Sequence, residues 1–192
     1  LTVKQAVSVA RQYGREGVVS ELYGVTNWDC SFKTYKLQGD WQAALGITVR
    51  VPHLAWMSMK GEAKRDWPAS IFFQSPWYLK FSDLETYFAR LNTALTRGKA
   101  VVRIAVLHPI ESFWVHYGPV DQTGAYCEEK KRWLEKLAEE LLYHTIDFDF
   151  LSEELLLKLQ EIESESLSHY QTILIPPMTT IRNTTLEFLI KC

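Results

Sequence analysis

Two short apolar runs near the start of the chain, separated by about one helix length, constrain the fold most. The first is Gly17-Val-Val-Ser-Glu-Leu-Tyr-Gly24 and the second is Ile47-Thr-Val-Arg-Val-Pro-His-Leu-Ala-Trp56. Between them, residues 36–45 have a helical pattern that ends at Gly46. Strands that alternate with helices usually pair in parallel, so this order predicts consecutive β-α units. Side chains at the carboxyl ends of such strands carry the chemistry, which singles out Glu21.

The same alternation continues in the second half of the chain. Residues 100–107 form a nearly uninterrupted β-rich run, typical of a strand buried on both faces of a parallel sheet. Around it we expect helix 84–95, loop 109–125, helix 126–144, strand 146–151, helix 153–159 capped by Ser152, and strand 172–176. The repeated order predicts a flavodoxin-like parallel sheet.

The predicted helix 126–144 has two distinct faces. Its apolar face contains Trp133, Leu137, Leu141 and Leu142, and its charged face contains Glu128, Lys131, Glu135 and Glu139. An amphipathic helix of this kind packs its apolar stripe on a core. We therefore expect the charged residues to form a solvated face.

Composition excludes several classes of function. The chain has 192 residues, 47% of them hydrophobic, and a net charge of −2, which lacks the basic surplus that nucleic-acid binding requires. No apolar run approaches the roughly 20 residues that span a bilayer, so we expect no membrane partner. Three widely spaced cysteines make neither a disulfide framework nor a metal site. We expect no metal and no cofactor, and nothing in the sequence assigns a compartment.

Tryptophan is unusually frequent in the first eighty residues. Five of the seven tryptophans of the chain lie there, at Trp28, Trp41, Trp56, Trp67 and Trp77. Large flat side chains either fill a core or stack against a ligand, and the faces of sugar rings suit them. The sequence leaves both interpretations open.

Both ends of the chain show helical patterns. Residues 3–13 have a helical pattern that ends at Gly14. Residues 184–192 have the pattern of a helix that breaks off just as it becomes amphipathic. From these patterns we expect a fragment of a longer protein.

Several short motifs carry a resemblance to known enzymes. They are Ser20-Glu-Leu-Tyr-Gly24, the spacing of Lys36, Asp40, Gly46 and His53, the segment His53-Leu-Ala-Trp-Met-Ser-Met59, and Arg90-Leu-Asn-Thr-Ala-Leu-Thr-Arg-Gly98 before a parallel strand. Together they resemble the end of the TIM barrel in glycoside hydrolases, namely the beta-galactosidases of family forty-two and the alpha-L-rhamnosidase-like enzymes. In these enzymes an amidotransferase-like domain follows the barrel. The likeness covers nearly the whole chain.

The resemblance implies a fold and a function for each part of the chain. Residues 1–80 would be the C-terminal portion of a (β/α)8 barrel, and residues 81–192 a truncated flavodoxin-like domain of the class I amidotransferase type. Glu21 matches the barrel carboxylate, which acts as nucleophile in a retaining enzyme or as base in an inverting one. His53 and Trp56 match sugar-binding positions at the last strand, and the expected partner is a carbohydrate.

The residues themselves leave two roles open for Glu21. Glycoside hydrolysis needs two carboxyl groups across an oxocarbenium-like transition state, and Glu21 would be one of them. Alternatively, Glu21 is a strand-end residue paired with a cation such as Arg50. The acid partner usually precedes this strand in the related enzymes, so we expect the fragment alone to be inactive.

Three further residues complete the predicted substrate site. Asp29 and Trp28 lie in the aromatic loop after the first strand, where Asp29 could bind sugar hydroxyls or act as partner acid. A lone histidine such as His53 is usually a core or loop residue, but a neutral imidazole also bonds sugar hydroxyls.

The second half lacks a recognisable catalytic motif. His108, Glu111 and His116 match no metal-binding spacing, and Cys127 opens a predicted helix without the sharp elbow of an amidotransferase nucleophile. We therefore expect a scaffold or an oligomerisation module, and in the second case a homo-oligomer formed through this domain. The alternative for the whole chain is a non-catalytic α/β binding or oligomerisation module. In that case Glu21, Asp29, His53 and Trp56 would not converge on one concave face.

Overall fold

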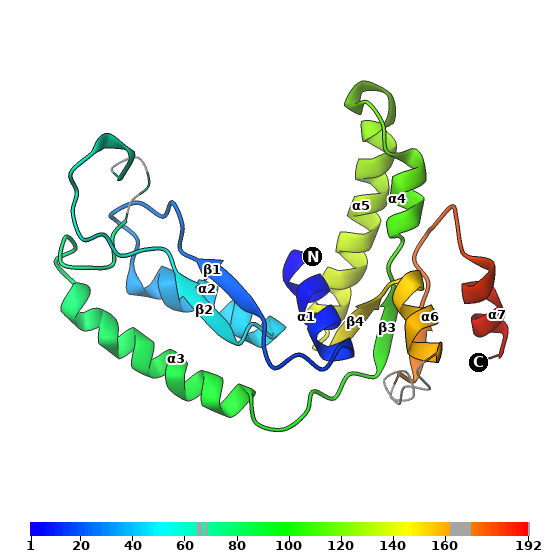
Figure 1. The fold of residues 1–192 in the computed structure, drawn as a ribbon, viewed down its shortest axis with the longest axis horizontal. Helices are drawn as coiled ribbons and strands as arrows, with labels where there is room; N and C mark the ends of the chain where they lie inside the picture. The colour runs from blue at the N-terminus through cyan, green and yellow to red at the C-terminus, as the bar shows by residue number, and fades with distance from the viewer. Residues whose placement is uncertain (65–66, 68, 162–169, 192) are drawn as a thin grey trace. The chain divides into compact units, whose positions relative to one another are not determined.

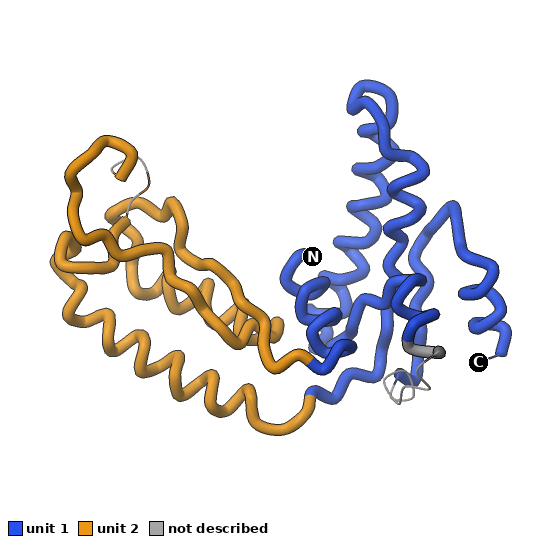
Figure 2. Tube along the Cα trace, in the orientation of Figure 1, with its two compact units in different colours: residues 1–14, 100–192 blue, residues 15–99 orange. Residues whose placement is uncertain are grey.

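The computed structural model describes residues 1–64, 67, 69–161 and 170–191. This part of the chain is an α/β protein with seven α-helices and two parallel sheets (Figure 1). It divides into two compact units: residues 1–14 with 100–192, and residues 15–99 (Figure 2). Within the described residues, no helix combines the length and the apolar character that crossing a bilayer requires.

The unit 15–99 is built on two parallel strands. Strand β1 (Val19–Leu22) pairs with β2 (Val49–Pro52), and helix α2 (Phe32–Leu45) connects them. Ser31 caps α2 by accepting a hydrogen bond from the Thr34 amide, and Gly46 ends it with a φ of 108° that favours glycine. After β2 the chain forms irregular loops and two short 3₁₀ turns, Glu62–Lys64 and Tyr78–Lys80, before helix α3 (Phe81–Leu95).

One face of the β1–β2 pair is covered by helices. Leu22 from β1 packs into a buried cluster with Tyr35 from α2 and with Phe81, Leu84 and Phe88 from α3. The two helices are also joined at the surface, where the Lys36 ammonium and the Asp40 carboxylate pair with each other and with the Tyr87 hydroxyl. These contacts hold α2 and α3 on the same side of the strands.

The opposite face of the pair is uncovered. Alternate residues of each strand point to this side, and the valines among them are well exposed: Val19 at 63%, Val49 at 46% and Val51 at 46%. Glu21 belongs to the same row and is also exposed. A sheet normally buries its apolar face against another layer, so this face has no covering layer in the described residues.

The unit 1–14 with 100–192 contains a three-stranded parallel sheet. Its strands are β3 (Ile104–Leu107), β4 (Phe148–Leu151) and β5 (Thr172–Leu174), in the spatial order β4-β3-β5. Helix α4 (Ile110–His116) and helix α5 (Val120–Tyr143) connect β3 to β4, and α6 (Glu153–Glu161) follows β4. Helix α7 (Asn183–Lys191) ends the described chain.

Helices cover both faces of this sheet. On one face, Val106, Phe148 and Phe150 pack against Leu134, Ala138 and Leu141 of α5. On the other face, Ala105 and Leu151 pack against Leu155 and Leu156 of α6, with Phe188 of α7 beside them. Burial on both faces explains why residues 104–107 and 148–151 are mostly apolar.

Helix α1 (Thr2–Gln12) lies along the outer edge of β4. The Ser8 hydroxyl accepts a hydrogen bond from the Phe150 amide at 2.8 Å, and the Gln12 side chain donates to the Phe150 carbonyl at 3.0 Å. Lys4 and Arg11 form ion pairs with the Asp147 carboxylate that precedes the strand. The helix therefore satisfies backbone groups that an open strand edge would leave free.

The structure confirms most predicted elements and corrects two predictions. Residues 109–125, predicted as a loop, contain all of α4 and the start of α5, because Pro109 and Pro119 occupy N-cap positions where the missing amide costs nothing. Trp133, predicted on the buried face of the helix, is exposed, and Leu134 takes that place. The predicted Ser152 cap is confirmed by its hydrogen bond from the Leu155 amide.

Candidate functional site

The predicted site residues lie at the carboxyl ends of β1 and β2. Glu21 is the third residue of β1, and its register partner on β2 is Val51. Its neighbour Leu22 is buried on the helix-covered face, so Glu21 points to the uncovered face. His53 follows β2 directly, and its amide donates to the Leu22 carbonyl at 2.7 Å. The strand pairing thus continues one step beyond β2.

Arg50 does not pair with Glu21. The Arg50 guanidinium forms an ion pair with Glu85 at 2.8 Å, donates to the Tyr23 hydroxyl at 3.2 Å and lies 3.8 Å from the centre of the Phe88 ring. The interpretation of Glu21 as an ion-paired strand-end residue is therefore wrong for Arg50, which points to the opposite face. In the described chain the Glu21 carboxylate has no ion-pair partner.

The loop that follows β1 has an unusual backbone. Tyr23, Val25 and Asn27 have positive φ angles of 69°, 58° and 63°. Residues with a side chain rarely adopt this conformation, and a β-branched residue such as Val25 does so least readily. The loop is held by the Thr26 hydroxyl, which donates to the Tyr23 carbonyl at 3.0 Å. Backbone strain of this kind is common at functional sites.

Two of the predicted substrate-binding tryptophans contact each other. The rings of Trp28 and Trp56 meet edge to face, with centroids 6.1 Å apart. Trp56 is 8% exposed, whereas Trp28 is 40% exposed and presents aromatic surface to solvent. The backbone of Trp56 is fixed on both sides, because its amide donates to the Ser70 hydroxyl and its carbonyl accepts from the Gln74 side chain.

His53 contributes an unsatisfied polar atom to this end of the strands. Its Nδ1 atom is buried and has no hydrogen-bond partner among the described residues. Gly24 lies against the imidazole ring, where an added Cβ would meet the ring Cγ at 3.8 Å. A buried polar atom without a partner is uncommon and calls for an explanation.

Asp29 stands apart from the other predicted site residues. It is exposed in the loop before α2, and its carboxylate forms no hydrogen bond or ion pair within the described ranges. The structure therefore joins Trp28 to Trp56 through their rings and aligns Glu21 with the end of β2. It does not join Asp29 to either group.

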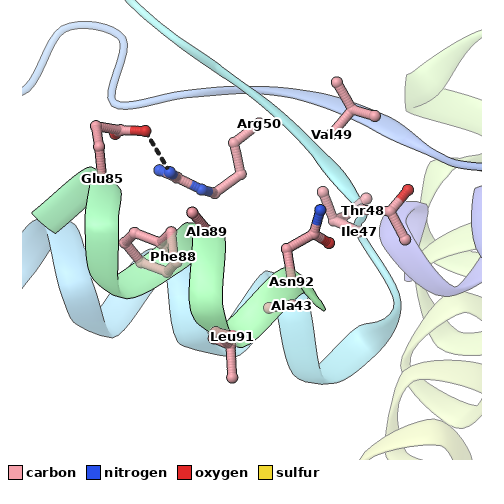
Figure 3. A pocket seen from close by; sticks show the side chains of 10 residues that line it. All are labelled: Ala43, Ile47, Thr48, Val49, Arg50, Glu85, Phe88, Ala89, Leu91 and Asn92. Atoms are coloured by element: carbon pink, nitrogen blue, oxygen red, sulfur yellow. Dashed lines mark hydrogen bonds and ion pairs between the residues drawn. The ribbon is translucent and has the colours of Figure 1, made fainter. Parts of the chain in front are cut away.

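A cavity of about 330 Å³ in the same unit lies away from these residues (Figure 3). It is situated between β2 and α3, on the helix-covered side, and it includes the residues that precede β2. Its wall carries the Arg50–Glu85 ion pair with Phe88 near it, and Asn92 lies further along α3, close to Ile47 and Thr48. Apart from Arg50, the sequence did not predict these residues as part of a site, because α3 supplies Glu85 and Asn92 more than thirty positions after β2.

The carboxyl ends of the strands in the three-stranded sheet are a second candidate position for a functional site. Open parallel sheets bind ligands where two strands are followed by connections in opposite directions, here between β3 and β5. In this structure the loops after the two strands are tied together. Ser112 accepts from the Thr179 and Thr180 amides at 3.0 and 3.1 Å, and Glu111 pairs with Arg182 at 2.5 Å. Only about 10 Å³ remains between these loops.

The other polar residues of this half are also engaged in local contacts. Cys127 lies two turns inside α5, not at its start as predicted, and its thiol faces the His116 carbonyl at 3.8 Å. His116 contacts the Thr179 hydroxyl and His108 contacts the Gln5 side chain. Among the described residues, no group of three or more His, Cys, Asp or Glu side chains could hold a metal ion.

Comparison with known proteins adds no further constraint. No family model, curated protein or solved structure matches the chain. The functional argument therefore depends on the geometry of the residues themselves.

Proposed function

We propose that this chain is part of a glycoside hydrolase that cleaves O-glycosidic bonds, with Glu21 as a catalytic carboxylate. The observation that carries the proposal is the uncovered face of the β1–β2 pair. In a (β/α)8 barrel the helices form an outer ring, and the opposite face of every strand points into the barrel. Two strands with both helices on one side and bare valines on the other have the form of two such β-α units.

The position of Glu21 on that face supports a chemical role. Active sites of barrel enzymes lie at the carboxyl ends of the strands, and Glu21 is one residue from the end of β1. Its carboxylate is on the uncovered side and is not neutralised by Arg50, which pairs with Glu85. A carboxylate in this position can act as nucleophile on an anomeric carbon or as base toward a water molecule.

The surrounding residues fit a carbohydrate substrate. The exposed ring of Trp28, buttressed by Trp56, offers an apolar surface for one face of a sugar. His53 lies at the same end of the strands with an unsatisfied nitrogen, and Asp29 carries a free carboxylate in the adjoining loop. Of these two groups, the exposed carboxylate of Asp29 is the one that solvent reaches, and under the proposal it accepts hydrogen bonds from sugar hydroxyls.

A second carboxyl group is required for catalysis. Retaining enzymes place the two carboxyl groups about 5 to 5.5 Å apart and inverting enzymes about 6.5 to 9.5 Å apart. No second carboxylate contacts the Glu21 side chain in the described chain, so under this proposal the partner acid comes from another strand of the barrel. The chain by itself would then be inactive.

The order of the second sheet supports the flavodoxin-like part of the proposal. Numbered along the chain, β3, β4 and β5 are the first, second and third strands, and their spatial order is 2-1-3. The flavodoxin-like fold begins with this order. The loops after β3 and β5 form a closed crevice, since they leave only about 10 Å³ between them. We therefore propose that this unit is a scaffold that joins copies of the protein and does not carry amidotransferase chemistry.

The test is Glu21→Gln in the full-length parent protein, assayed on a panel of aryl glycosides. We expect kcat to fall at least about hundredfold, which corresponds to about 2.7 kcal/mol of barrier, with an unchanged melting temperature. Glu62→Gln, an exposed carboxylate in the loop after β2, is the matched control and should keep full activity. A loss of less than tenfold in Glu21→Gln would reject the chemical role.

The closed crevice also favours a second candidate function, a non-catalytic assembly module. In that case the bare valine face and the aromatic loop make protein contacts. Glu21→Gln would then leave any activity of the parent unchanged, whereas substitution of the valines would alter its oligomeric state in sedimentation velocity.

A further inference from the structure

Helix α1 has its two faces the opposite way round from an ordinary surface helix. Toward β4 it buries three polar side chains, Lys4, Ser8 and Gln12, together with Val7. Away from β4 it exposes apolar side chains, of which Val9 is 50% exposed. A helix at a protein surface normally packs its apolar stripe on the core and presents its charges to solvent. The arrangement of α1 therefore needs an explanation.

The exposed apolar residues of α1 form a single stripe. Ala6, Val9 and Tyr13 are spaced by three and four positions, which places them on the same side of the helix, and all three are exposed. Lys4 and Arg11, the two charged residues of the helix, both pair with carboxylates of the β4 segment instead. Single exposed apolar residues are normal, but here the whole solvent side of a helix lacks a charged side chain.

The contacts with β4 prevent α1 from turning this stripe inward. The Lys4 ammonium donates to the Asp147 carboxylate at 2.6 Å near the start of the helix, and Arg11 pairs with Asp149 at 3.1 Å near its end. Asp149 is 1% exposed, so rotation of the helix would take a cation away from a buried carboxylate, which is strongly unfavourable. The stripe therefore remains available for a second surface.

The position of α1 in the chain indicates which surface this is. Helix α1 directly precedes β1, the strand that carries Glu21. In a (β/α)8 barrel each helix belongs to the outer ring and packs its apolar side on the strands. Under the proposed function, α1 is therefore the helix of the preceding β-α unit of the barrel, and the strand of that unit is neither β1 nor β2.

We propose that the stripe of Ala6, Val9 and Tyr13 packs on the apolar outer face of the barrel strand that precedes α1 in the parent protein, while the polar side of α1 stays on β4. Both sides of the helix are then covered, one by apolar contacts and the other by hydrogen bonds and ion pairs. The identity of the partner strand rests on the proposed function. The inversion of the two faces follows because α1 serves two layers, of which the described residues contain one.

Thiol labelling of Val9→Cys tests the proposal, because it measures the exposure of the stripe directly. The variant is made in the 192-residue chain and in the full-length parent and treated with N-ethylmaleimide, and peptide mass spectrometry separates the new thiol from the natural cysteines. We expect the new thiol to react at least about a hundredfold more slowly in the parent, because a buried thiol reacts only after local opening. Lys33→Cys, on the exposed side of α2, is the control and should react equally in both proteins.

Ala6→Cys gives the same measurement if Val9→Cys does not fold in the parent. Equal reactivity of the stripe in the two proteins would overturn the proposal. Protection already present in the chain alone and increasing with its concentration would also overturn it, because a second copy would then cover the stripe.

The outcome is separate from that of Glu21→Gln, because a barrel can carry another chemistry. Equal labelling together with a loss of activity in Glu21→Gln would reject the covered stripe alone. Protection of the stripe together with full activity of Glu21→Gln would reject the hydrolase alone.

Discussion

At the scale of single residues, Arg50 determines which carboxylate near β1 and β2 forms an ion pair. Its guanidinium stacks on Phe88, donates to Tyr23 and pairs with Glu85, all on the helix-covered face of the strands. Arg50 is the neighbour of Val51, which is the register partner of Glu21. Because neighbouring residues of a strand point to opposite faces, Arg50 and Glu21 point to opposite faces of the pair, and the arginine cannot also reach Glu21. The carboxylate that carries the proposed chemistry therefore stays free, since its most obvious partner is used elsewhere.

Gly39 gives a prediction at this scale. An added Cβ at this position of α2 would lie 2.2 Å from Cζ of Phe88 and 2.9 Å from the Tyr23 hydroxyl. Alanine usually stabilises a helix relative to glycine by about 1 kcal/mol, but overpacking a buried site typically costs 1 to 3 kcal/mol or more. Phe88 is buried under Arg50 and has little room to move. We expect Gly39→Ala to lose about 2 kcal/mol in urea unfolding.

The control for this prediction is Lys33→Ala on the exposed side of the same helix. It should change the free energy of unfolding by less than about 0.5 kcal/mol, the usual range for surface substitutions. A Gly39→Ala protein as stable as the wild type would mean that α2 and α3 do not pack as closely as described.

At the scale of elements, α1 is attached to β4 mainly by polar groups. Its buried residues are Lys4, Val7, Ser8 and Gln12, of which only Val7 is apolar. Burial lowers the pKa of Lys4 even though Asp147 pairs with it, so the ion pair is formed at a cost in desolvation. The attachment depends on the geometry of individual hydrogen bonds and ion pairs more than on buried apolar area.

This attachment predicts a specific dependence of stability on pH. Burial alone would raise the pKa of Asp147, but the hydrogen bond and charge of Lys4, together with the charge of Arg11, outweigh it and lower the pKa below 3.8. A carboxyl group with a lowered pKa in the folded state stabilises the fold above its unfolded pKa, and this contribution is lost as the pH falls through the folded value. Asp147→Asn should therefore be less stable than the wild type at pH 7, by about 1 kcal/mol.

The difference between the two proteins should shrink as the pH falls below about 4 and vanish near pH 2. Urea midpoints measured across this range test the prediction. Asp121→Asn, at the exposed start of α5, is the control and should show no such convergence. A pH-independent difference for Asp147→Asn would point to a steric effect of the amide instead of a lost ion pair.

At the scale of the whole molecule, the two units differ in how completely they bury their sheets. The three-stranded sheet is covered on both faces and is capped at its β4 edge by α1. The two-stranded sheet is covered on one face only, and its other face leaves Val19, Val49 and Val51 exposed. The two-stranded sheet therefore leaves apolar side chains in contact with solvent, which the three-stranded sheet does not.

The bare face predicts measurable binding of a hydrophobic dye. The paired change Val49→Thr and Val51→Thr keeps the side-chain shape and adds hydroxyl groups to the uncovered side. We expect this variant to bind anilinonaphthalene sulfonate with at most half the fluorescence of the wild type, and to self-associate less in sedimentation velocity. Val120→Thr, which is exposed at the start of α5, should leave both readouts unchanged. Equal dye binding in all three proteins would show that the valine face is covered in solution.

The sequence alone determined where most helices and strands lie, because the signals for them are local. Apolar periodicity located β1 to β4, α2, α3 and most of α5 but missed α4. Gly46 and Ser152 marked a helix end and a helix start that the structure confirms. The α/β class and the strand-end position of Glu21 followed from the same patterns.

Tertiary structure decided which of those residues meet. The choice of Glu85 as the partner of Arg50, the packing of α1 on a strand more than 130 positions away, and the exposure of the apolar side of α1 all depend on contacts between segments distant in sequence. Local periodicity separates an apolar face from a polar one, but it carries no information about which other element covers either face. For that reason the face to which Glu21 belongs could be predicted from its strand, whereas its freedom from an ion pair could be established only in three dimensions.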